Sequence, residues 1–377
     1  IGLGIAWFSK LCYGIAGGKS FLEAADSFDT IRILGVMPRL ALCYGAASII
    51  VLLTRCKHIL WVVATLLVGY GVILLVDEYG LVFSEQNIVS VIDQAVLGID
   101  HMYKDTIDGV KLAFDPEGLL STIPSIAHVL IGFWAGMKMM EEKDINMRVN
   151  RLFIIGAVLM VIGFLFDYAI PINKKLWTPT YALVTCGLAS TLLALLIWII
   201  DIKGYKKWCR FFEAFGINPL FLYVLGGVLG IIFGSFKFGA ADTSIKGYVY
   251  GEFLSPMIGD PVLASCIYAL LFIALCWSIG YILYRKKIYK IRTFLLYRQK
   301  EFCDRLACAD RNIRSLSCRS VACSCAGRSV AGGNKKITLK KKHQKVLLCF
   351  IYRQPPAILV ENALASSIER SEMSFRA

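Results

Sequence analysis

Long apolar runs separated by short polar segments dominate the pattern of this chain. A helix needs roughly 20 apolar residues to cross the hydrocarbon core of a bilayer. Eight runs reach or approach that length, and the first two are the shortest. They are residues 1–16, 39–54, 59–76, 119–139, 151–171, 178–200, 216–234 and 260–284. The pattern therefore predicts an all-α fold, a polytopic transmembrane helix bundle of about eight spans in contact with lipid.

Charges in the connecting segments predict the orientation, because cytoplasmic loops carry an excess of Lys and Arg. The segments predicted to lie inside are basic and comprise 55–58, 140–150 and 201–215. The segments predicted to lie outside comprise 17–38, the acidic segment 77–118, 172–177 and 235–259. Lys174 and Lys175 depart from this rule, which leaves two interpretations: tolerated charges or a site for an anionic group.

Apolar side chains share one helical face within residues 88–96, opposite Ser90, Asp93 and Gln94. This pattern predicts an amphipathic helix that lies on the membrane surface or covers the bundle. Simple packing of the helix on the bundle is an equal alternative.

Composition supports a membrane protein and separates the chain into two parts. Hydrophobic residues make up 57% of the 377, and the mean hydropathy is +0.63. From residue 285 onward there are 21 Lys and Arg against 6 Asp and Glu, whereas the remainder has 20 against 21. The net charge of +14 therefore belongs to the tail, which argues for a cytoplasmic position before it argues for nucleic acid. We expect a membrane domain at 1–289 and a disordered basic tail, or an out-of-frame artefact, at 290–377.

The 13 cysteines show neither a disulfide framework nor zinc-ligand spacing, so we expect no metal. Candidate chemistry lies instead in three polar clusters predicted on the outer side. Arg32 and Arg39 belong to the first, and their guanidinium groups could bind an anionic substrate group or only anchor the interface. Asn173 and Lys174 belong to the third, where the amide could hydrogen-bond a sugar.

The second cluster holds the acid–base candidates and Asp93, a further substrate-binding candidate. His101 beside Asp100 suits a general base with an orienting carboxylate, although an exposed loop histidine is the alternative. Asp115 and Glu117 precede an apolar run, so they could act on substrate or cap the helix that follows.

His128 lies within the predicted span 119–139. An ionisable side chain at that depth is a functional candidate, and a packing histidine is the equal alternative.

At these clusters the sequence resembles a known family. Residues 32–44, read I-R-I-L-G-V-M-P-R from Ile31, are similar to its R-I-P-G-V-L-Q-R signature, with Leu34 in place of the proline. Residues 98–103, 115–118 and 173–177 are similar to its later blocks, in the same order. The resemblance, over about residues 1–289, is to the heparan-alpha-glucosaminide N-acetyltransferase-like membrane proteins, including their bacterial branch.

The resemblance implies a membrane acetyltransferase that moves acetyl from cytoplasmic acetyl-CoA to an amino sugar or glycan on the opposite face. In that family the histidine expected to handle the acetyl group lies in a His- and Trp-containing segment upstream of this stretch. We therefore expect further helices before Ile1, and the chain as given lacks that histidine. The absence of a large outer domain and of loop cysteines favours a bacterial inner membrane.

Acetyl-CoA is anionic, so basic inside residues are candidates for its phosphates, with ordinary positive-inside residues as the alternative. They are Lys206, Lys207 and Arg210. Two other functions stay open: a transporter or flippase of a glycan or anionic solute, and an inactive truncated remnant. A transporter would favour ionisable groups along the midplane and internal repeats, whereas only His128 lies at depth.

Overall fold

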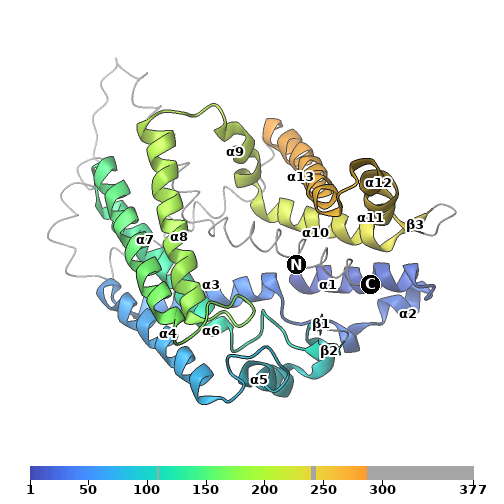
Figure 1. Ribbon diagram of the computed structural model, residues 1–377, viewed down its shortest axis with the longest axis horizontal. Coiled ribbons are helices and arrows are strands. Elements are labelled where there is room, and N and C mark those ends of the chain that lie inside the picture. The colour runs from blue at the N-terminus through green and yellow to red at the C-terminus, as the bar shows by residue number, and fades with distance from the viewer. Residues whose placement is uncertain (108–109, 239–242, 287–377) are drawn as a thin grey trace, which may run out of the picture.

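The computed structural model describes residues 1–107, 110–238 and 243–286, so the predicted tail at 290–377 lies outside the described residues (Figure 1). Helices account for most of the described chain. The longer ones are α1 (Gly2–Ala16), α3 (Val36–Leu53), α4 (Ile59–Val76), α5 (Ile88–Leu97), α6 (Thr122–Glu141), α7 (Ile145–Asp167), α8 (Pro179–Ile197), α9 (Cys209–Ile217), α10 (Pro219–Ser235) and α13 (Pro261–Arg285). The shorter ones are α2 (Phe21–Ala25), α11 (Ile245–Gly247) and α12 (Ser255–Ile258). Two small hairpins pair β1 (Lys104–Ile107) with β2 (Val110–Ala113) and β3 (Lys237–Phe238) with β4 (Thr243–Ser244).

All eight predicted apolar runs form helices, which confirms the all-α membrane bundle. Six of the described helices are long and apolar enough to cross a bilayer, and the pair α9 and α10 adds a seventh if it counts as one broken span. That pair is bent by 82°. Asn218 and Pro219 lie at the bend, where proline cannot donate the hydrogen bond that would continue α9. Helix α1 has 15 residues, which is short of the length that a span requires.

Two predicted boundaries were wrong at the basic segments. Helix α7 begins at Ile145, inside the predicted loop 140–150, because the Asp144 side chain caps it and Arg151 pairs with Glu142 at 2.9 Å. Helix α9 occupies the second half of the predicted loop 201–215. Its aromatic side chains pack on α13, where Phe211 stacks on Trp277 with ring centroids 5.3 Å apart.

Helices α3, α4, α6 and α8 surround the largest apolar core. Its buried members are Ala47, Val51, Ile59, Val63, Leu67, Ala127, Leu130, Ile131, Ala182 and Cys186. Most of these side chains are aliphatic and of medium size, so the helices interdigitate without polar groups between them. A smaller core joins α6, α7 and α8 at their other end.

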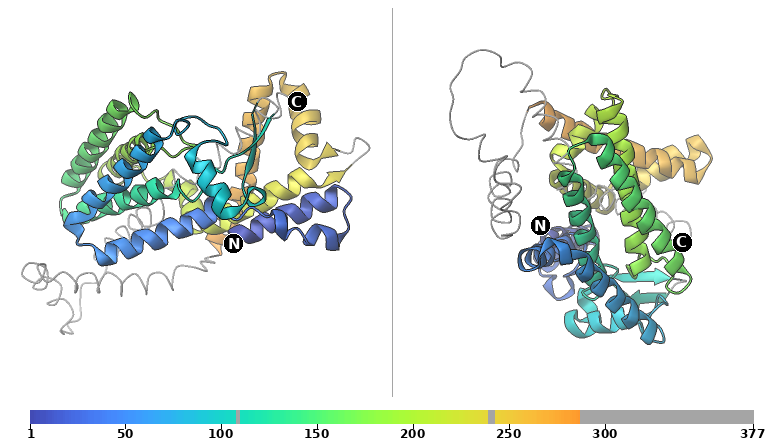
Figure 2. Two further views of the ribbon diagram at one scale, coloured as in Figure 1. Left: turned by 90° about the horizontal axis from the view of Figure 1, so that it is seen from below. Right: turned by 90° about the vertical axis from the view of Figure 1, so that its left-hand side faces the viewer.

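Helices α7 and α8 pack most closely, side by side and antiparallel (Figures 1 and 2). Gly156 and Gly187 lie at the contact, and a Cβ built on Gly187 would stand 2.7 Å from the Gly156 carbonyl oxygen. Two turns further along α7, Gly163 lies equally close to Val184, since a Cβ built on Gly163 would stand 2.5 Å from Val184 Cγ2. Small residues at a membrane helix contact let the backbones approach until van der Waals packing holds the pair.

The acidic segment 77–118 covers one end of the bundle with α5 and the β1–β2 hairpin (Figure 2). Helix α5 forms as predicted, and it buries polar side chains together with Val89, which lies in a second apolar core with Tyr70 and Leu74. Ser90 and Asp93 are fully buried, whereas Val91 and Val96 are 46% and 61% exposed. Ser90 Oγ donates to the Ala113 carbonyl at 2.6 Å, so this hydrogen bond and the burial of Val89 hold α5 on the bundle, while Val91 and Val96 point outward. Val89 of the predicted apolar face therefore packs on the bundle, whereas the exposed part of that face suits contact with lipid.

Candidate active site

The first and second predicted clusters meet at the end of the bundle covered by the acidic segment. Arg32, in the extended segment before α3, donates from Nε to Asp115 Oδ2 at 2.9 Å. Its Nη2 donates to Asp115 Oδ1 and to Glu117 Oε2, and its guanidinium lies 4.9 Å from the centre of the Tyr103 ring. Burial alone lowers the pKa of Arg32, but the hydrogen bonds and charges of the two carboxylates outweigh burial and raise it above its ordinary value.

Asp115 organises the backbone around this ion pair. Its Oδ1 accepts from the Glu117 amide at 3.0 Å, and its Oδ2 accepts from the Tyr103 amide at 3.3 Å. The side chain is fully buried, whereas that of Glu117 is 20% exposed. Neither carboxylate caps α6, which begins at Thr122 with Ser121 before it. The capping alternative was therefore wrong for both residues, and Asp115 binds the loop to Arg32 instead.

Arg39 lies in the first turns of α3 and is only 5% exposed. Its Nη1 donates to the Pro116 carbonyl at 2.8 Å and its Nη2 to the Ser121 carbonyl at 2.7 Å and to Ser125 Oγ. The guanidinium carbon stands 4.0 Å from the centre of the Trp177 ring. All of these partners are uncharged, so the nearby Glu117 balances the buried cation only from a distance.

Asp93 reaches the same loop from α5. Its Oδ1 accepts from the Leu119 amide at 2.8 Å, and its Oδ2 is buried without a hydrogen bond in the described part of the chain. Gly118 leaves room for this carboxylate, because a Cβ there would stand 1.7 Å from Oδ2. Desolvation, with a contribution from the charge of Asp115, raises the pKa of Asp93 to about 6.

The third cluster brings Trp177 against Arg39. Asn173 builds the turn that precedes it, since its Oδ1 accepts from the amides of Lys175 at 2.8 Å and Leu176 at 3.3 Å. Trp177 then has a φ of 52°, in the left-handed region that non-glycine residues rarely occupy. The Tyr70 hydroxyl of α4 donates to the Leu176 carbonyl at 2.6 Å and so holds the turn against α4. Backbone strain of this kind persists only where its surroundings enforce it.

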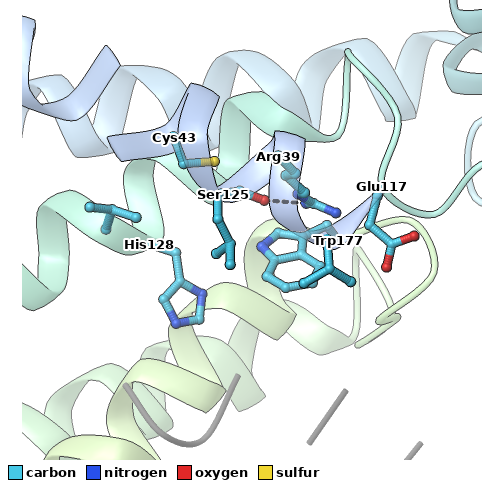
Figure 3. A pocket seen from close by; sticks show the side chains of 9 residues that line it. Arg39, Cys43, Glu117, Ser125, His128 and Trp177 are labelled. Atoms are coloured by element: carbon cyan, nitrogen blue, oxygen red, sulfur yellow. Dashed lines mark hydrogen bonds between the residues drawn. The ribbon is translucent and has the colours of Figure 1, made fainter. Parts of the chain in front are cut away.

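A small pocket of about 30 Å³ opens between α3, α6 and this turn. The residues that line it are Val36, Arg39, Leu40, Cys43, Glu117, Ser125, His128, Val129 and Trp177. Figure 3 shows Ser125, His128 and Trp177 around it, with Arg39 over the indole and Glu117 beyond. Ser125 and His128 are three residues apart on α6, so they share one face. The His128 and Trp177 rings are 6.1 Å apart.

Three buried nitrogen atoms at this pocket have no hydrogen-bond partner among the described residues: Arg39 Nε, His128 Nδ1 and Trp177 Nε1. Each of these side chains is at most 7% exposed. Buried polar atoms in native proteins are almost always paired, so three orphans beside one pocket mark a place for a polar group. The packing alternative for His128 leaves this nitrogen unexplained.

Several residues that were predicted to act on or bind substrate instead contact the backbone or form ion pairs. His101 Nδ1 lies 2.8 Å from the Ile31 carbonyl, and Asp100 pairs with Lys104 at 3.0 Å, so Asp100 does not orient the imidazole. Lys175 pairs with Asp105 at 2.8 Å, which compensates one of the two lysines predicted to lie outside. Lys174 is half-buried in the Asn173 turn.

The basic candidates lie apart from this cluster. These side chains are exposed and follow the C-terminal end of α8, whereas the cluster lies at its N-terminal end. They are Lys206, Lys207 and Arg210. No group of three or more His, Cys, Asp or Glu side chains suited to a metal ion occurs within the described residues.

Sequence reasoning singled out Arg39 and His128, included Trp177 only as the end of the motif at 173–177, and missed Ser125. Trp177 carried two signals: it ends the motif at 173–177, and it directly precedes Thr178 and Pro179, the N-cap and first residue of α8. Ser125 carried none beyond its spacing of three from His128.

Comparison with known proteins gives two similar relatives, while no protein-family model matches the chain. The heparan-alpha-glucosaminide N-acetyltransferase of Homo sapiens is 30% identical over 209 residues, which cover 52% of this chain and 29% of the relative. The protein of the same name from Mus musculus is 30% identical over 215 residues, with the same coverage of each chain. The match thus spans less than a third of the length of these relatives. This similarity confirms the resemblance found in the motifs and relates the chain, at the level of the family, to the heparan-alpha-glucosaminide N-acetyltransferases.

Proposed function

We propose that this chain forms part of a membrane-embedded acetyltransferase, which moves acetyl from cytoplasmic acetyl-CoA to an amino sugar or glycan on the opposite face. The observation that carries the proposal is the charged cluster of Arg32, Arg39, Asp115 and Glu117 at one end of an apolar bundle, in which Arg39 and Asp115 are buried. Buried charges in a membrane bundle are costly and mark functional sites. The two relatives are N-acetyltransferases by name, which gives that site a chemistry.

Within the cluster we assign the acceptor side to Glu117. It is the more exposed of the two carboxylates, and it lines the pocket, so it can accept a hydrogen bond from a sugar amine or hydroxyl. Arg32 and Asp115 hold it in position through the ion pair and the Glu117 amide. His101 and Asn173 are positioning residues in this proposal, because their side-chain atoms already bind the backbone.

We assign the donor side to Lys206, Lys207 and Arg210. They follow the helical stretch Pro179–Ile202, which has 24 residues. At 1.5 Å per residue that stretch is roughly 36 Å long, enough to cross a hydrocarbon core of about 30 Å. Exposed ammonium and guanidinium groups beyond its end are therefore placed to meet the phosphates of CoA on the side opposite the cluster. This separation supports transfer across a membrane, for which a bacterial inner membrane is our proposal.

The test uses sealed membrane vesicles from cells that express the protein from its complete reading frame. Radiolabelled acetyl-CoA is supplied on one side and glucosamine on the other, and labelled N-acetylglucosamine is measured in each compartment. Labelled product that depends on expression supports the function. Transport of unmodified sugar without acetylation would instead establish the transporter alternative, and the absence of both would establish an inactive remnant.

The donor assignment has its own variant. Lys206→Ala combined with Lys207→Ala should raise the KM for acetyl-CoA several-fold while the KM for glucosamine stays constant. Lys57→Ala is the matched control, because Lys57 lies in another basic segment on the same predicted side. An equal effect of both variants on the KM for acetyl-CoA would refute the donor assignment, because general membrane electrostatics would then explain the change.

A further inference from the structure

The pocket beside Trp177 presents hydrogen-bond donors without acceptors. Arg39 Nε and Trp177 Nε1 each carry one N–H, and neither atom can accept a hydrogen bond. Both are buried and unpartnered among the described residues. A buried donor left unpaired costs about 1–3 kcal/mol, so a ligand that satisfies both must offer an acceptor atom. An oxygen atom with two lone pairs meets this requirement.

Charge further restricts the ligand. The Arg39 guanidinium binds two backbone carbonyls and one hydroxyl, all neutral, so none of its hydrogen bonds goes to a charged group and Glu117 balances its charge only from a distance. A buried cation favours an oxygen that carries, or can develop, negative charge. His128 Nδ1, the third unpartnered nitrogen, lies on the same pocket wall and adds a second polar contact in either tautomer.

Size and the remaining walls exclude the larger parts of either substrate. A volume of about 30 Å³ holds one water or a few atoms, and neither a sugar ring nor a nucleotide enters it. Val36, Leu40 and Val129 give the pocket an apolar surface, and Cys43, Glu117 and Ser125 complete its lining. An acetyl group combines these properties, because its methyl group suits the aliphatic wall and its carbonyl oxygen suits the N–H donors.

We propose that this pocket is an acyl site in which Arg39 Nε and Trp177 Nε1 donate to the carbonyl oxygen of an acetyl group, an assignment that rests on the proposed function. When the acceptor amine attacks, the C–N bond forms and the C–S bond of the thioester breaks. Sulfur leaves with the bonding electron pair and finally receives the proton lost by the amine. The carbonyl oxygen bears negative charge during this step, and the two donors stabilise it.

The acyl carbonyl has two sources, the donor thioester and the acetylated product. Binding to the purified protein in detergent separates them: acetyl-CoA is compared with CoA, and N-acetylglucosamine with glucosamine. A preference of at least about fivefold for the acetylated member of either pair is expected. The pair that shows it identifies the source. No preference in either pair would overturn the acyl site, and this comparison needs no variant.

Trp177→Phe supplies the second test, because it removes the indole N–H while an aromatic ring remains beside Arg39. The expected result is a fall in kcat of roughly tenfold to a hundredfold, with the preference for the acetylated ligand reduced. Trp7→Phe is the matched control, since it removes an indole N–H that donates to the Ala25 carbonyl at 2.9 Å, outside the pocket. Wild-type kcat and preference in Trp177→Phe would refute the role of Trp177.

The two proposals can fail separately. A wild-type protein that prefers acetylated ligands but transfers no acetyl would refute the proposed function and leave the acyl site standing. A protein that transfers acetyl, and binds acetylated and unacetylated ligands alike, would retain the function and refute the acyl site.

Discussion

Replacing Asp115 by asparagine tests whether the Arg32–Asp115 pair holds the site together. The two carboxylate oxygens accept from Arg32 Nε, Arg32 Nη2 and the amides of Tyr103 and Glu117. In Asp115→Asn, one oxygen becomes an amide NH₂ that faces two of these donors, and the charge is lost. The fold around the loop should therefore weaken.

The magnitude follows from burial. Breaking a buried ion pair costs about 3–5 kcal/mol. The Arg32 side chain is 29% exposed and keeps Glu117 as a partner, so water and Glu117 recover part of the loss. We expect about 3 kcal/mol, which is a roughly hundredfold change in the ratio of folded to unfolded protein.

The assay is reversible unfolding by SDS in mixed micelles, followed by circular dichroism. Asp100→Asn is the control, because Asp100 forms an exposed pair with Lys104 that is worth less than about 1 kcal/mol. A loss below about 1 kcal/mol in Asp115→Asn would refute the reasoning. In an Arg32→Gln background the same substitution should cost about 2 kcal/mol less, since the shared interaction is already absent.

Three further predictions concern Asp93, Gly118 and the α7–α8 contact. Because burial raises the pKa of Asp93 to about 6, its neutral form favours the fold. The contribution of Asp93 to the free energy of unfolding should therefore be largest below about pH 4, fall between about pH 4 and 6, and stay constant above. Asp93→Asn should flatten this dependence in SDS titrations and raise stability at pH 7 by at most about 2–3 kcal/mol, whereas an unchanged pH profile would contradict the assignment. Gly118→Ala should lower stability by about 1–3 kcal/mol because of overpacking, and Asp93→Ala in the same chain should reduce that loss. Thermal unfolding in detergent measures both effects. Equal losses with and without Asp93 would refute the clash. Gly187→Leu should lower the midpoint of thermal unfolding, because it separates α7 from α8. Gly69→Leu should leave the midpoint unchanged, since a Cβ at Gly69 meets nothing within 4 Å. Equal midpoints of the two variants would exclude a close contact between α7 and α8.

The sequence contained enough information for the spans and for the convergence of the polar clusters. Apolar length predicts helices directly, and alternation of spans brings the starts of α3, α6 and α8 to one end. The hydrogen bonds between these elements could not be predicted from the pattern of apolar and polar residues. Periodicity predicted an amphipathic α5 but not that it buries Ser90 and Asp93, because a helical wheel does not show that these side chains bind backbone groups at Ala113 and Leu119.

Other features depended on contacts distant in sequence. The β1–β2 hairpin has no strong alternation, and Ala113 at its end is held by Glu85, 28 residues earlier. Trp177 became a site residue only because Arg39, far away in the chain, packs on its ring. Such pairings depend on tertiary placement, which local patterns do not encode.

The close contact between α7 and α8 also has a consequence for motion. Two helices joined through glycine backbones have little side-chain bulk that can slide, so they should rotate as one rigid body against α6. Trp177 is attached directly to the start of α8, whereas His128 belongs to α6. A rotation of the α7–α8 pair by a few degrees would therefore change the separation of these two side chains and open or close the space between them.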